Sequence, residues 1–138
     1  MEPKYGYQRI AERSLLACDA LIDVGIHEKA TFLVYHGFES TGCALSSHYG
    51  LKVGVGISHR DKLDKFKEST QISKNTDLIN GFLKVAVDLE SLRNKVLYPK
   101  INRHGHIIKM PEEQVTLAQV KNLKNKVFEI WLLVNKVI

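Results

Sequence analysis

The chain has 138 residues, 44% of them hydrophobic, with only three prolines and nine glycines, a composition that excludes a disordered or repetitive protein. This length fits one domain, residues 1–138, with one hydrophobic core that needs no disulfide or metal. The formal net charge of +5 is concentrated, because residues 91–111 hold Arg93, Lys95, Lys100, Arg103 and Lys109 without an acidic residue, and the remainder sums to zero.

The two cysteines, Cys18 and Cys43, both lie in apolar stretches and are expected to be buried thiols. Two thiols without a secretory signal fit a reducing compartment better than a disulfide framework. The first ten residues lack an apolar signal region, and no stretch approaches the length of a membrane span. We therefore expect a cytoplasmic protein that does not enter a membrane.

Residues 7–24 are predicted to form the first helix, because apolar or small side chains recur every three or four residues. This stripe contains Tyr7, Ile10, Ser14, Ala17, Cys18 and Leu21. Gly25 is expected to end the helix.

Residues 28–48 form the second predicted helix, which carries two stripes of side chains. The apolar stripe contains Ala30, Leu33, Val34, Gly37, Phe38, Thr41, Ala44 and Leu45. The more polar stripe contains Phe32, Tyr35, His36, Glu39 and Cys43. A helix with two such faces touches two neighbours, and we interpret them as its own bundle and a second subunit.

The third predicted helix follows the loop "YGLKVGVGIS" and opens at Ser58, which stands three residues before Asp61 as a capping pair. It continues through Leu63 and Phe66 towards Ile72. The "GVG" in the loop lacks the third glycine and the preceding strand of a phosphate-binding loop.

The fourth helix has the clearest pattern, with apolar side chains spaced by four and three residues up to the proline that ends it. They are Leu78, Phe82, Val85, Leu89, Leu92 and Val96, followed by Pro99. Because a residue before proline avoids the helical conformation, Tyr98 should turn away from the helix end. Arg93 lies beside this stripe.

The last helix is expected to open at Pro111 with Glu112 and Glu113 in its first turn. Its stripe contains Val120, Leu123, Val127, Ile130, Trp131, Val134 and Val137. No hairpin turn separates alternating segments, so the basic stretch before Pro111 is predicted to be a loop. The fold class is all-α, an antiparallel bundle of four long helices and one shorter helix.

The basic stretch is either a solvated connector or a surface for phosphate groups, and the sequence leaves both interpretations open. If it binds RNA, the contacting side chains are Lys95, Lys100, Arg103, His104, His106 and Lys109. Arg93 needs a partner at the edge of an apolar face, which is either a phosphate or a helix carboxylate such as Glu39.

Two further side chains are candidates for proton transfer. Tyr98 is either a hydrogen-bond donor beside a phosphate or an amphipathic packing residue at the helix end. His36, on the more polar stripe, is either a general acid or base or an interface histidine. His104 and His106 lack a nearby Cys or carboxylate, so no metal site is predicted.

Three stretches, "TFLVYHGFESTGCAL", "ISHRDKLDKF" and "LRNKVLYP", together with the final amphipathic helix, resemble the HEPN (higher eukaryotes and prokaryotes nucleotide-binding) family. The resemblance covers about residues 7–137. It implies a HEPN-like helical bundle that acts as a homodimer. Many members are metal-independent endoribonucleases, of the toxin or antiviral effector type, that cut RNA in the cleft between two subunits. Others are catalytically silent modules that bind a nucleotide or a partner protein.

The active members carry an Arg, often followed by a polar residue such as Asn, and a His after four to six intervening residues. Arg93 and Asn94 match the first two positions, whereas Tyr98 stands where the His is expected. The resemblance implies that Arg93 holds the scissile phosphate and Asn94 supports it. Three substitutes for the missing His are open: Tyr98 acts through hydrogen bonding alone, His104 or His106 folds back from the loop, or His36 serves from the second helix.

The resemblance therefore implies RNA or a nucleotide as the ligand, a second copy of the chain as a partner, and no cofactor. An antitoxin or a nucleotidyltransferase is a further expected partner. The alternative function is a silent HEPN module that binds a nucleotide or a protein such as a nucleotidyltransferase.

Overall fold

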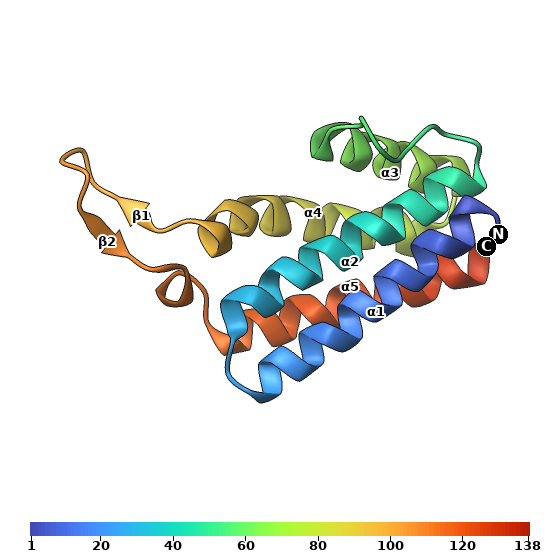
Figure 1. Cartoon of the computed structure of the whole chain (residues 1–138). Helices are drawn as coiled ribbons and strands as arrows, with labels where there is room; N and C mark the ends of the chain where they lie inside the picture. Colours follow the sequence, from blue (N-terminus) through green and yellow to red (C-terminus); the bar gives the residue numbers. More distant parts are fainter.

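A computed structural model describes residues 1–138 as five α-helices and one small β-hairpin (Figure 1). The long helices are α1 (Pro3–Asp23), α2 (His27–His48), α4 (Thr76–Leu97) and α5 (Leu117–Val137), and the shorter one is α3 (His59–Ser73). The predicted bundle of four long helices and one shorter helix is confirmed. None of these helices combines the length and hydropathy needed to cross a bilayer.

Helix α2 is the central element of the bundle, in contact with α1, α3, α4 and α5. Between residues 34 and 46 every side chain except that of His36 is buried. The more polar stripe of α2 is therefore covered within the chain, with Tyr35, Glu39 and Cys43 all buried. The expectation that this stripe contacts a second subunit is wrong for these three residues, because α3 folds back over α2.

The buried face of α1 is shifted by about one residue along the sequence from the predicted stripe. Its buried residues are Ala11, Ser14, Leu15 and Cys18, whereas Ile10 is 43% exposed. The difference follows from the close approach of α1 to Gly37 of α2, where an added Cβ would lie 3.2 Å from a methyl carbon of Leu15. Gly25 ends α1 as predicted, with a positive φ of 80° that favours glycine.

Helix α3 begins as predicted, because the Ser58 hydroxyl accepts a hydrogen bond of 3.1 Å from the backbone N–H of Asp61. Phe66 anchors α3 in the core by packing against Phe38 and Phe82, with ring centroids 5.0 Å from each. Ile72, which the pattern placed towards the core, is 44% exposed instead.

The contact between α2 and α3 depends on the missing side chain of Gly42. A Cβ at this position would lie 2.3 Å from Cδ2 of Phe66, closer than two carbon atoms can approach. The Phe66 ring is fully buried, so it has no open space into which it can move. Gly42 therefore sets the distance between these two helices.

We predict that Gly42→Ala lowers the free energy of unfolding by about 1–3 kcal/mol, because the added methyl overpacks the core against Phe66. Urea denaturation followed by circular dichroism measures this change. Gly6→Ala in α1 is the matched control, since its Cβ would meet only a Met1 sulfur at 3.9 Å and should raise stability by about 0.5–1 kcal/mol. Equal effects of the two substitutions would contradict the proposed packing constraint.

Helix α4 buries the predicted stripe, with Leu92 only partly covered. Tyr98 is extended (φ −131°, ψ 143°), as expected before Pro99. The last helix begins later than predicted: Pro111 opens a single 3-10 turn, η1 (Pro111–Glu113), and α5 starts at Leu117. The physical reason is the capping box, in which the Thr116 hydroxyl accepts from the Gln119 N–H while the Gln119 side chain accepts from the Thr116 N–H.

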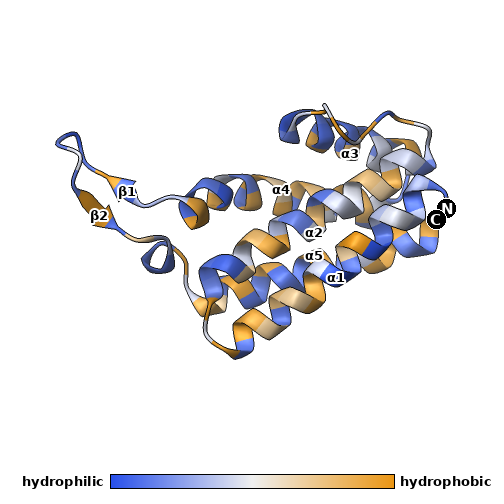
Figure 2. Cartoon of the chain, viewed as in Figure 1, coloured by the Kyte–Doolittle hydropathy of each residue, from blue (hydrophilic) through white to orange (hydrophobic).

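The basic stretch is a β-hairpin, so the prediction of a loop without a hairpin was wrong. Strands β1 (Lys100–Ile101) and β2 (Ile107–Lys109) pair antiparallel. Asn102 shapes the turn, since its side-chain oxygen accepts from the N–H groups of His104 and His106 at 2.9 and 3.0 Å. The hairpin extends away from the helices, as Figures 1 and 2 show.

Candidate anion-binding site

Arg93 of α4 lies against Tyr35 of α2, and its guanidinium carbon is 5.6 Å from the centre of the Tyr35 ring. The Nε atom of Arg93 is buried and has no hydrogen-bond partner. The predicted alternative of an ion pair between Arg93 and Glu39 is wrong, because Glu39 binds other residues. Arg93 is partly exposed, so an anion would be held by its outer Nη nitrogens and not by the buried Nε.

Glu39 is only 6% exposed and forms two ion pairs with α3. Its Oε2 lies 2.6 Å from Nδ1 of His59, and its Oε1 lies 3.4 Å from Nζ of Lys62. The His59 ring also meets the Tyr35 ring edge-on, with centroids 6.1 Å apart. We call the set Tyr35, Glu39, His59, Lys62 and Arg93 the Arg93 cluster.

Three helices position this cluster through their local geometry. Tyr35 and Glu39 are four residues apart and therefore share one face of α2. The Ser58 cap starts α3 at His59, so that His59 and Lys62, three residues apart, both face Glu39 from the first turn. Arg93 enters from the C-terminal half of α4.

Positive and negative charges meet at the cluster. Arg93 and Lys62 face the carboxylate of Glu39, and Glu90 of α4 is a second negative charge that acts on Tyr35. Burial raises the pKa of the Tyr35 hydroxyl above its usual range, the negative charge of Glu39 raises it further, and Arg93 opposes the shift. Tyr35 is thus an uncharged phenol at neutral pH and adds no negative charge beside Arg93.

Cys43 lies one turn beyond Glu39 on α2 and is not an activated nucleophile. Burial, and secondly the charge of Glu39, raise the pKa of its thiol to about 11, although Lys62 opposes the shift. Only a thiolate is strongly nucleophilic, so a thiol that stays protonated is inert. The predicted burial of both cysteines is confirmed.

The other predicted catalytic residues make no hydrogen bond to Arg93. Tyr98 is 63% exposed at the end of α4, and its backbone oxygen, not its hydroxyl, is used in a hydrogen bond, accepting from Gln114. Asn94 and His36 are exposed on α4 and α2. No hydrogen bond joins Arg93 to any of these three residues.

The predicted RNA-binding residues gather on the hairpin, away from the Arg93 cluster. Lys95, Lys100, Arg103, His104, His106 and Lys109 are all exposed, and all but Lys95 belong to the hairpin. Lys100 and Lys109 stand directly opposite each other across the two strands, where like charges are destabilising. The structure therefore forms two separate positive areas.

His59 and Lys62 were missed as site residues by the sequence analysis. The signal for them was present, because an acidic residue within a buried stripe, such as Glu39, needs a basic partner. A basic residue at the capped start of the following helix is a suitable partner, and "SHRDK" provides it. What the sequence could not show is which of several basic residues comes within reach.

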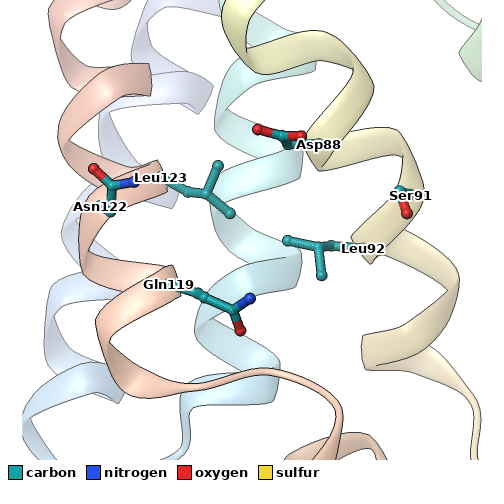
Figure 3. Close-up of a pocket in the computed structure, with 6 residues that line it drawn as sticks. All are labelled: Asp88, Ser91, Leu92, Gln119, Asn122 and Leu123. Atoms are coloured by element: carbon teal, nitrogen blue, oxygen red, sulfur yellow. The ribbon is translucent and has the colours of Figure 1, made fainter.

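A cavity of about 330 Å³ lies between α4 and α5, apart from the Arg93 cluster (Figure 3). Its walls are formed by Asp88, Ser91, Leu92, Gln119, Asn122 and Leu123, and Leu92 and Leu123 point towards each other across the gap. No cationic side chain lines this cavity, and the Asp88 carboxylate would repel a phosphate. No three His, Cys, Asp or Glu side chains come together as a metal-binding group.

The chain was also compared with known proteins. No family model matches it, and comparison with curated proteins and with solved structures gives no significant match. The Arg93 cluster therefore rests on the geometry of this chain.

We predict that Arg93→Met raises the free energy of unfolding by about 1 kcal/mol. A methionine removes a buried donor without a partner, a gain that exceeds the lost contact with the Tyr35 ring. Thermal and urea denaturation measure the change, with exposed Lys95→Met on the same helix as the control, expected within about 0.5 kcal/mol of wild type. A clear loss of stability in Arg93→Met would assign Arg93 a structural role.

Proposed function

We propose that this protein binds RNA through its backbone phosphates, with Arg93 as the anchor, and cleaves it without a metal ion as a homodimeric, HEPN-type endoribonuclease of the cytoplasm. The observation that carries the proposal is the Arg93 guanidinium, which lies against the Tyr35 ring and has a buried Nε without a hydrogen-bond partner. Maintaining a cation in this way costs desolvation, and a bound anion offsets that cost.

A phosphate suits this site because of the kinds of donor present. Arg presents a planar fork that holds two oxygens of one phosphate. Lys62 belongs to the same cluster with its side chain partly exposed, and it adds a second positive charge. A phosphodiester is thus stabilised by both charge and hydrogen bonding at the Arg93 cluster.

The hairpin favours a long polyanion over a small anion. Opposed Lys100 and Lys109 repel each other, and a phosphate lying between them removes that repulsion. Because the hairpin and the Arg93 cluster are separate, a ligand that contacts both needs phosphates spaced along a chain. RNA has this property.

A catalytically silent module that binds a nucleotide or a nucleotidyltransferase is the second candidate function. One observation favours it: Tyr98 takes the place of the HEPN motif His, is exposed, and makes no hydrogen bond to Arg93. Under this alternative the Arg93 cluster still binds a phosphate, but RNA remains intact.

The decisive experiment measures binding of labelled single-stranded RNA at several salt concentrations, and its cleavage in EDTA. We expect Arg93→Ala to weaken binding about tenfold or more, and Lys100→Ala with Lys109→Ala to reduce the slope of log K against log salt by roughly 1–2. Cleavage should persist in EDTA and be lost in Arg93→Ala.

The matched control is Lys121→Ala, which removes an exposed lysine from α5, outside both positive areas. It should bind and cleave like the wild type. Equal weakening of RNA binding by Arg93→Ala and Lys121→Ala would show that the RNA is held only by nonspecific charge attraction. Binding without cleavage by the wild type would favour the silent module.

A further inference from the structure

Within the Arg93 cluster, Glu39 and His59 form a carboxylate–imidazole pair. Glu39 is buried and its Oε2 lies 2.6 Å from Nδ1 of His59. A carboxylate only accepts hydrogen bonds, so Nδ1 of His59 carries a hydrogen and is the donor of the hydrogen bond to Glu39. In the neutral ring the other nitrogen, Nε2, then has a free lone pair, the arrangement required of a general base.

The position of His59 makes this lone pair accessible. Its side chain is 52% exposed although its partner carboxylate is buried. It stands at the first residue of α3, where Ser58 fixes the start of the helix. The buried carboxylate thus orients an imidazole that solvent and a ligand can reach.

Tyr35 is the shared neighbour of His59 and Arg93. The His59 ring lies 6.1 Å and the Arg93 guanidinium carbon 5.6 Å from the centre of the Tyr35 ring. Because both lie against one ring, His59 and Arg93 belong to the same small region of the molecule. We take this shared neighbour as the basis for placing a phosphate on Arg93 and its ribose beside His59.

We infer that His59 is the general base of RNA cleavage at the Arg93 cluster, with Glu39 as its positioning residue. This inference rests on the proposed function. It assigns to α3 the role that the HEPN motif gives to a His of the fourth helix, where this chain has Tyr98.

The reaction balances with these groups and solvent water. Nε2 of His59 takes the proton of the ribose 2′-hydroxyl, the O2′–P bond forms, and the P–O5′ bond breaks. The departing O5′ takes a proton from water, and the imidazolium later returns its proton to the hydroxide so formed. Arg93 and Lys62 hold the negative charge on the phosphate oxygens. The products are a 2′,3′-cyclic phosphate and a 5′-hydroxyl.

The other candidate bases have no carboxylate partner. His36 is exposed and makes no hydrogen bond, and His104 and His106 lie between β1 and β2, where Nε2 of His104 accepts a hydrogen bond from Nε of Arg103. His27 is occupied at the other end of α2, where its Nε2 lies 2.7 Å from the Glu112 backbone oxygen. Among the six histidines, His59 alone is paired with a carboxylate.

The test compares His59→Gln, His59→Ala and the wild type in RNA binding and in cleavage with EDTA present. The Gln side chain can still donate a hydrogen bond to Glu39, which protects the fold, but it cannot take a proton. We expect binding within about twofold of wild type and cleavage reduced about 100-fold or more. Added imidazole should partly restore cleavage in His59→Ala and not in His59→Gln, where the amide fills the space.

The matched control is His48→Gln, at the C-terminal end of α2, which should cleave like the wild type. Cleavage by His59→Gln at the wild-type rate, or loss of RNA binding in that variant, would overturn the role of His59. The binding proposal would be unaffected, because it is tested separately by RNA binding of Arg93→Ala. RNA bound but left intact by the wild type would overturn both cleavage and this role. Absence of RNA binding by the wild type would overturn the proposed function itself.

Discussion

The buried carboxylate of Glu39 is the constraint on which the site depends. A charge that is removed from water must be paired, because its desolvation costs several kcal/mol. Both of its partners, His59 and Lys62, belong to the first turn of α3. The Ser58 cap sets where α3 begins, and the requirement to pair one acidic residue on α2 then favours the face of α3 that turns inwards.

The start of α3 in turn determines what is exposed beside it. Tyr35 lies one turn before Glu39 on α2, beside the first turn of α3. Arg93 contacts the Tyr35 ring from α4. An aromatic ring, and not a carboxylate, is therefore the neighbour of its positive charge. The close α2–α3 contact at Gly42 holds the rest of α3 in place and leaves its first turn to the charged residues. The residues of α3 that pack in the core therefore lie apart from the charged residues of its first turn.

The sequence predicted the helices well because their apolar spacing is regular and their ends carry strong local signals, such as the Ser58 cap and Gly25. It failed where tertiary contacts decide. The buried face of α1 depends on how closely Leu15 approaches Gly37, and a stripe pattern is uncertain by about one residue. The hairpin was missed because its strands have two and three residues, too few to show alternation.

For the candidate site, the sequence identified Arg93 but not its surroundings. The linear motif drew attention to Tyr98, just beyond the end of the same helix, and to the hairpin. The actual neighbours, Tyr35 and His59, come from other helices, and no local pattern encodes their distance from Arg93. The sequence could have predicted that Glu39 pairs with a basic residue. Only the fold shows that its partners are Lys62 and His59 and not Arg93.

The attachment of the hairpin also gives the molecule a mechanical connection. The Gln114 amide donates to the backbone oxygens of Lys95 and Tyr98, and Nε2 of His27 lies 2.7 Å from the Glu112 backbone oxygen, so the base of the hairpin is tied to α4 and to the start of α2. The two strands are therefore attached at their base to the last turn of α4, which follows Arg93, while their tip extends away from the helices.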